Sequence, residues 1–96
     1  MSYKDEYHPR VKADLKKLDK IAVKEIHTTH LDILLDNPFN GECLYGALEG
    51  VFSYHFRKNK VDYRIAYIFD DESKIVYIIM IGKRENFYEA LKRRLS

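Results

Sequence analysis

The sequence predicts an α+β fold in a small single domain spanning residues 1–96, and three observations lead to that prediction. A chain of 96 residues suffices for one modest hydrophobic core and is too short for two domains. Apolar residues recur at helical spacing before residue 37, whereas from Val51 onward they alternate with a period of two. The hydrophobic share of 46%, with 14% aromatic residues, argues against a disordered chain.

The first predicted elements are a short strand and an amphipathic helix. Residues 2–8, "SYKDEYH", alternate apolar and charged side chains as a strand with one apolar side does. Pro9 suits the first turn of a helix, where its missing N–H group costs nothing. Val11, Leu15 and Leu18 then recur at helical spacing, so we expect a helix over residues 9–19.

A second helix is predicted over residues 20–36. Its apolar stripe includes Val23, Ile26 and Leu34, and it ends at "DNP", because a residue before proline is pushed out of the helical region. Residues 39–50, "FNGECLYGALEG", hold three glycines and little periodicity. We interpret them as a connecting loop with room for a short extended piece.

Two strands with one polar and basic side follow this loop. In residues 51–57, "VFSYHFR", Phe52, Tyr54 and Phe56 share one face, so Ser53, His55 and Arg57 point to the other. After the polar turn "KNKV", residues 62–70, "DYRIAYIFD", repeat the pattern. Arg64 joins the His55 face if the two strands pair with their apolar sides together.

The last two elements are a buried strand and a helix. Residues 74–82, "KIVYIIMIG", follow the turn "DDES". They are apolar at both odd and even positions, as in a strand that is covered on both faces. Residues 84–95, "RENFYEALKRRL", place Phe87, Leu91 and Leu95 four apart and predict a C-terminal helix.

Charge is divided unevenly between the two halves of the chain. Residues 1–50 carry seven Lys/Arg and nine Asp/Glu, whereas residues 51–96 carry ten and six. The basic second half suggests an anionic partner, and an ordinary solvated surface is the alternative. With one cysteine, no signal peptide and no apolar run of about 18 residues, we expect a cytoplasmic protein without disulfide or membrane.

Among common catalytic motifs, the sequence contains no glycine-rich phosphate loop and no Cys-x-x-Cys pair. His27 and His30 in "HTTH" lie three apart, as zinc ligands can, but no third ligand is close in sequence. Helical geometry places both on the apolar stripe, so we favour a structural role and predict no metal and no cofactor.

The aromatic residues are interpreted mainly as core. They could stack on unpaired bases, but strand parity assigns most of them to the buried side. The residues concerned are Phe52, Tyr54, Phe56, Tyr63, Tyr67 and Phe69.

The basic strand face is the strongest candidate for function. The sequence pattern gathers seven residues on one side of the sheet with no carboxylate among them, namely Ser53, His55, Arg57, Arg64, Lys83, Arg84 and Tyr88. Such a surface fits phosphate binding, and an acidic protein partner is the alternative.

Residues 44–88 resemble the RelE/ParE toxin superfamily. The stretch holds, in order, a Leu-x-Gly-x-Leu loop ("LYGAL"), a strand of basic residues, "DYR" in the next strand, an acidic hairpin, and "GKR" followed by a tyrosine. The resemblance implies a bacterial toxin with two N-terminal helices on a twisted antiparallel sheet of about four strands and a short C-terminal helix. It also implies neutralisation by a cognate antitoxin.

Within that superfamily "GKRENFY" favours the RelE-like branch, whose members cleave mRNA in the ribosomal A site without a metal. Ribosome and mRNA are then the other expected partners. The alternatives are the ParE-like branch, which poisons DNA gyrase, and a degenerate toxin that acts as a binding module.

The resemblance also implies site residues. Arg64 and Arg84 would stabilise the charged phosphate, and Tyr88 or His55 would transfer protons. His55 and Ser53 stand where RelE-like toxins often have lysine or arginine. The expected RNA-binding residues are Ser53, Arg57, Lys58, Lys60 and Lys83.

His55 is the residue with an expected pKa shift. Neighbouring cations disfavour the charged imidazolium, so we expect the pKa of His55 to lie below its ordinary value. A neutral imidazole near pH 7 is suited to accept the proton of an RNA 2′-hydroxyl.

Overall fold

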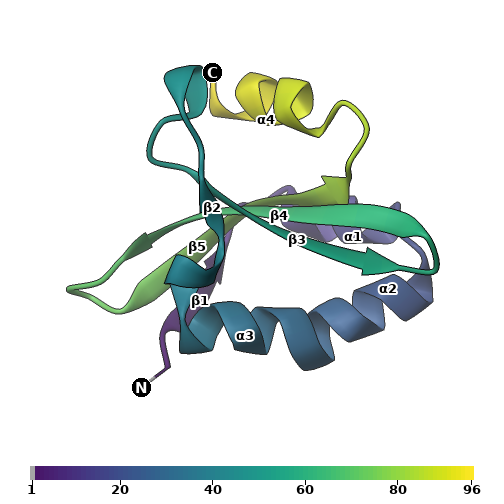
Figure 1. The fold of residues 1–96 in the computed structure, drawn as a ribbon, viewed down its shortest axis with the longest axis horizontal. Helices are drawn as coiled ribbons and strands as arrows, with labels where there is room; N and C mark the ends of the chain where they lie inside the picture. The colour runs from purple at the N-terminus through teal and green to yellow at the C-terminus, as the bar shows by residue number, and fades with distance from the viewer. Residues whose placement is uncertain (1) are drawn as a thin grey trace.

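A computed structural model describes residues 2–96 and contains one five-stranded sheet. In chain order the strands are β1 (Lys4–Tyr7), β2 (Glu42–Cys43), β3 (Phe52–Lys58), β4 (Val61–Asp70) and β5 (Ile75–Lys83). Their spatial order is β1-β5-β4-β3-β2 (Figure 1). β1 runs parallel to β5, and the other neighbours are antiparallel.

The expectation of about four antiparallel strands is therefore corrected in two respects. A two-residue strand, β2, forms inside the predicted loop and pairs with the start of β3. β1 is parallel because the helices that follow it carry the chain across the sheet before the strands of the second half begin. Apolar alternation predicts strands but contains no information about which neighbour they take.

The helices predicted over residues 9–19 and 20–36 are both present, but the first is shorter than predicted and includes neither Pro9 nor residues 17–19. α1 (Val11–Lys16) is followed by a rod made of α2 (Lys20–Glu25), a π-helical turn (Ile26–His30) and α3 (Leu31–Asp36). The Asp19 carboxylate caps α2 by accepting a hydrogen bond from Ile21 N at 3.0 Å. The rod ends at Asn37, whose backbone is extended before Pro38.

The face of the sheet toward α1, α2 and α3 carries the larger core (Figure 1). All six aromatic residues that strand parity assigned to the buried side lie in or against this core. Phe56, Tyr63 and Tyr67 are buried, and Phe52, Tyr54 and Phe69 are half-buried. This prediction is confirmed.

The opposite face is covered only in part, by the C-terminal helix α4 (Phe87–Leu95) and a 3-10 turn at Gly46–Leu48 (Figure 1). Phe87 and Leu91 of α4 pack there with Ala66, Ile79 and Met80. A bulge between Ala66 and Tyr67 pairs them with Met80 and Ile78, so that Ile79 and Met80 both face α4. β5 is thus buried on both faces, as its sequence predicts.

The β3–β4 hairpin has a tight two-residue turn. Asn59 and Lys60 have φ values of 52° and 67°, as the two central residues of a type I′ turn require. This turn fixes the register of β3 against β4, on which the candidate site depends. Within residues 2–96, no helix has the length and apolar content that crossing a bilayer requires.

Candidate active site

Strand register places Arg64 at the centre of the polar face. On one side Arg64 pairs with His55 of β3, and on the other it pairs with Gly82 of β5. A Cβ atom on Gly82 would lie 3.4 Å from Phe87 Cδ1. Such a Cβ would make ordinary van der Waals contact with Phe87, which shows how closely α4 folds back over the end of β5, next to Arg64.

Four side chains form a continuous chain of contacts around Arg64. Ser53 Oγ lies 3.1 Å from His55 Nε2, which lies 3.3 Å from Arg64 Nη1. Arg64 Nη1 also donates a hydrogen bond to the Tyr88 hydroxyl. The Arg64 guanidinium carbon lies 4.8 Å from the centre of the Tyr88 ring. A histidine, an arginine and a tyrosine from three separate elements thus meet at one place.

These contacts fit a neutral His55. Arg64 only donates hydrogen bonds, so His55 Nε2 must accept, and the Ser53 hydroxyl then donates to the same nitrogen. Burial lowers the pKa of His55, and the Arg64 guanidinium lowers it further, while Glu42 and Asp62 act in the opposite direction. The predicted direction is confirmed, although burial contributes more than the neighbouring cations.

Arg57 and Arg84 lie beside this chain on either side of Asp62. Asp62 Oδ1 is 3.7 Å from Arg57 Nη1, and Asp62 Oδ2 is 3.8 Å from Arg84 Nη1. The side chains of Arg57 and Arg84 are 65% and 68% exposed, so these ion pairs are weak and open to exchange. His55, Arg57, Arg64 and Arg84 line an open groove with Asp62.

The expectation of a surface free of carboxylates is wrong. Asp62 pairs with Arg57 across the β3–β4 hairpin, and Glu42 of β2 comes within 3.9 Å of His55 Nε2. Strand parity could have found Asp62, because it lies two residues before Arg64. No sequence signal indicated Glu42, which reaches the site only because β2 forms.

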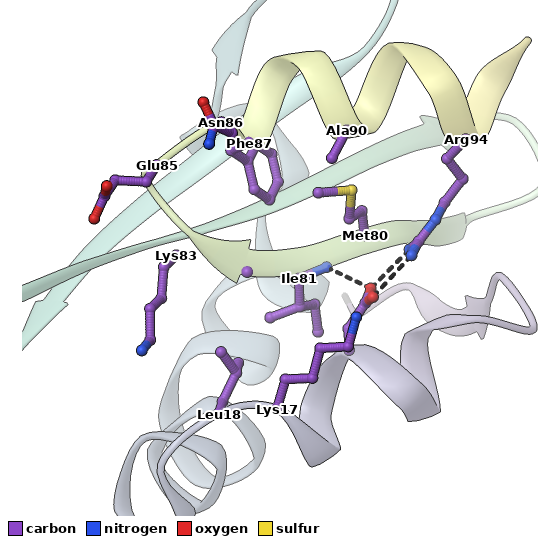
Figure 2. A pocket seen from close by; sticks show the side chains of 12 residues that line it. Lys17, Leu18, Met80, Ile81, Lys83, Glu85, Asn86, Phe87, Ala90 and Arg94 are labelled. Carbon is purple, nitrogen blue, oxygen red and sulfur yellow. Dashed lines mark hydrogen bonds and ion pairs between the residues drawn. The ribbon is translucent and has the colours of Figure 1, made fainter.

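Four of the five expected RNA-binding residues do not line the groove, and Arg57 is the one that does. Ser53 is 1% exposed, so it supports His55 and is out of reach of a ligand. Lys58 Nζ lies 3.1 Å from Glu25 Oε1, on the helix-covered side. Lys83 pairs with Tyr63 of the larger core and points away from α4, on the side where Leu18 lies (Figure 2). Lys60 is exposed in the hairpin turn, next to Asp62 and Arg84 in an adjacent hollow.

The two histidines of "HTTH" have separate environments. His30 is buried, with Nδ1 2.8 Å from the Tyr54 hydroxyl and Nε2 2.8 Å from Glu25 Oε2, as a structural histidine is expected to be. His27 is exposed, so the prediction that both lie on the apolar stripe is wrong for it. The π-helical turn at Ile26–His30 changes the angular step that this prediction assumed. In residues 2–96 no three His, Cys, Asp or Glu side chains form a metal-binding group.

Comparison with known proteins shows which family and which solved structures this chain is similar to. Residues 6–92 match the family model described as the ParE-like toxin of type II bacterial toxin-antitoxin systems. No curated protein matches the chain in sequence.

Among solved structures, the RelBE2 toxin–antitoxin complex of Mycobacterium tuberculosis is similar with a TM-score of 0.75 and 27% identity, over 88% of this chain and 100% of that one. A mutant of Escherichia coli toxin RelE in the free state is similar with a TM-score of 0.74 and 24% identity, over 100% of both chains. The archaeal RelE–RelB complex of Pyrococcus horikoshii is similar with a TM-score of 0.63 and 23% identity, over 88% of this chain and 98% of that one. The last two similarities establish a shared fold.

Proposed function

The chain belongs to the ParE-like toxins of type II bacterial toxin–antitoxin systems, with a fold like that of RelE, and we propose that it is a ribosome-dependent, metal-free endoribonuclease that cleaves mRNA in the A site. The observation that carries this proposal is the contact of Arg64 with both a neutral imidazole and a phenol. A cation between two proton-transfer groups is what phosphodiester cleavage by a 2′-hydroxyl requires.

In the proposed reaction His55 Nε2 takes the proton of the 2′-hydroxyl. The 2′-oxygen then forms a bond to the adjacent phosphorus, and Arg64 and Arg84 stabilise the negative charge on the phosphate oxygens. The bond from phosphorus to the 5′-oxygen breaks, and the Tyr88 hydroxyl donates its proton to that oxygen. The products are a 2′,3′-cyclic phosphate and a 5′-hydroxyl, and protons exchange with water to restore His55 and Tyr88.

The contact between Arg64 and His55 has a role in this proposal. While Arg64 donates to Nε2, the lone pair of His55 is occupied. A bound phosphate is a stronger acceptor for a guanidinium than an imidazole, because the hydrogen bonds are assisted by charge. The substrate would therefore draw Arg64 away from Nε2, and the 2′-hydroxyl would then have to displace only the Ser53 hydroxyl, which can rotate to donate elsewhere.

The ribosome and a cognate antitoxin are the proposed partners, in the cytoplasm where ribosomes are. With a net charge of +2, the protein offers few cations for binding to free RNA, so positioning by the ribosome is needed. Efficient cleavage of naked mRNA at physiological salt would contradict this dependence. The similar structures that are toxin–antitoxin complexes support the antitoxin.

The proposal is tested by inducible expression followed by mapping of mRNA ends, and by cleavage assays with purified translating ribosomes. We expect cuts at A-site codons that are strongly reduced in Arg84→Ala and Tyr88→Phe variants. Arg93→Ala is the matched control, because Arg93 is an exposed arginine of α4 outside the groove. Unchanged growth inhibition and cleavage in both site variants would refute the assignment.

Inhibition of DNA gyrase is the second candidate, because the matching family is described as ParE-like. A gyrase supercoiling assay separates the two candidates. Inhibition of supercoiling by the purified protein, without mRNA cleavage on ribosomes, would replace the endoribonuclease proposal. Absence of both activities would favour a degenerate toxin that acts as a binding module.

A further inference from the structure

The edge of β5 beyond β1 is closed by two side chains instead of a strand. β1 pairs with β5 only from Ile75 to Ile78, and His8 N donates the last backbone hydrogen bond to Ile78 O. After Ile78, Arg94 Nη1 donates to Ile79 O at 2.9 Å, and Ile81 N donates to Asp14 Oδ2 at 3.1 Å. A carboxylate and a guanidinium thus take the place of the missing strand neighbour.

Asp14 and Arg94 also bind each other through both ends of their planar groups. Arg94 Nη1 lies 2.7 Å from Asp14 Oδ2, and Arg94 Nη2 lies 2.8 Å from Asp14 Oδ1 (Figure 2). Their side chains are only 10% and 13% exposed, and the hydrogen bond to Asp14 raises the pKa of Arg94. Such a shielded two-point pair has one preferred geometry, in contrast to an exposed ion pair.

This pair joins elements from opposite faces of the sheet. Asp14 belongs to α1 on the face of the larger core, and Arg94 belongs to α4 on the other face, as the positions of the two helices in Figure 1 show. The two residues are separated by 80 positions in the chain. The pair therefore fixes α4 to α1 and, through the hydrogen bonds with Ile79 and Ile81, to β5.

α4 has few other anchors on the sheet. It has nine residues, and those that are buried are Phe87 and Leu91. A helix of this length depends on tertiary packing for its stability. Arg94 follows Leu91 by three positions and so continues the stripe that faces the sheet. It is the third anchor, at the end of the helix remote from Phe87.

Tyr88 is next to Phe87 on this helix, so the direction and rotation of α4 determine where its hydroxyl lies. We propose that Asp14 and Arg94 are positioning residues of the active site, which hold α4 so that Tyr88 stays against Arg64. The inference rests on the proposed function where it concerns cleavage. Its structural part concerns the contact between Arg64 and Tyr88 and does not depend on that function.

A double-mutant cycle tests the proposal. Single-turnover cleavage on ribosomes is measured for wild type, Arg94→Ala, Tyr88→Phe and the double variant, with Arg93→Ala as control. We expect Arg94→Ala to reduce the rate constant by about tenfold to a hundredfold, as small misplacements of catalytic groups do. In the Tyr88→Phe background the same change should have almost no effect, because the group it positions is gone. Equal effects in both backgrounds would overturn the proposal.

Two further measurements separate positioning from folding and from the proposed function. Hydrogen exchange should show α4 amides exchanging faster in Arg94→Ala while β4 and β5 amides keep their protection, and the NMR signal of a labelled Tyr88 ring should shift. If Arg94→Ala does not fold, Arg94→Lys replaces it, because lysine keeps the charge but cannot bind Asp14 at two points. The expected changes in cleavage, hydrogen exchange and Tyr88 signal are the same. An unchanged Tyr88 signal would overturn the proposal even if wild type did not cleave mRNA. Absence of wild-type cleavage with a shifted Tyr88 signal would refute the proposed function alone.

Discussion

The two faces of the sheet differ in how their polar groups are paired. On the face covered by α1, α2 and α3, His30 contacts Glu25 and Tyr54 at 2.8 Å, and Lys58 approaches Glu25 at 3.1 Å. On the face that carries α4, the pairs of Asp62 with Arg57 and Arg84 measure 3.7 and 3.8 Å and are exposed. The polar contacts of Glu25 are thus short on one face, whereas the ion pairs of Asp62 on the other face are long and exposed, and their arginines remain available for a ligand.

The same strands supply both faces. In β3, Phe56 is buried among the helices while His55 and Arg57, its neighbours in sequence, face the groove. Alternation in a strand thus allows stability and function to be carried by adjacent residues with little interference. The comparison leads to four predictions, ordered from the largest expected effect to the smallest.

Truncation of the helix-covered core should have the largest effect on stability. Ile65 is 0% exposed, and Ile65→Ala should lower the free energy of unfolding by about 2–5 kcal/mol, through lost burial and a cavity. Urea denaturation measures this change. Ile68→Ala on the same strand is the control. Because Ile68 is 41% exposed, this variant should lose far less free energy of unfolding. Equal losses at the two positions would contradict the assignment of the core.

Removal of Arg64 should have the largest effect on activity and little effect on stability. Loss of the central cation in Arg64→Ala should reduce the cleavage rate by about a hundredfold to a thousandfold, as loss of one stabilising donor does elsewhere. The urea midpoint should stay close to that of wild type, because Arg64 is half-exposed and lies outside both cores. Ribosome cleavage kinetics and urea denaturation together check this. A strongly destabilised variant would show that the two faces are not separable.

His55 should control the pH dependence of cleavage. The neutral imidazole is the active form, so the rate should rise with pH and reach half its maximum below the ordinary histidine pKa of about 6.5. His55→Gln should lower the maximum by about a hundredfold and abolish this dependence. Rate profiles between acidic and neutral pH measure both quantities. A wild-type rate in His55→Gln would assign the base to Tyr88.

Two cations that are adjacent in sequence provide the smallest and most direct comparison of the faces. Arg57→Ala should weaken substrate binding several-fold and reduce its salt dependence, because Arg57 lines the groove. Lys58→Ala should change binding by less than about twofold, because Lys58 is held by Glu25 on the other face. Binding to ribosomes at several salt concentrations measures both. A larger effect for Lys58 than for Arg57 would support the expectation from the sequence that Lys58 binds RNA.

Much of the site was predictable from local pattern. Period-two alternation placed His55, Arg57 and Arg64 on one face, and the hairpin register confirms this. The existence and order of the helices and the double-sided burial of β5 also followed from the spacing of apolar residues, whereas the first and last helices are shorter than that spacing predicted. These features depend on the side-chain period of a helix or strand, which neighbouring residues are enough to define.

Other features were decided only by the tertiary structure. Ser53 is buried, Lys83 lies on the helix-covered face, and His27 is exposed because a π-helical turn interrupts the helical spacing. The contact of Arg64 with Tyr88 and the pairing of Asp14 with Arg94 join positions 24 and 80 residues apart. Periodicity assigns a side chain to a face, whereas its partners depend on register, on bulges and on the elements that cover that face. Those are set when distant segments pack together to bury a common apolar surface.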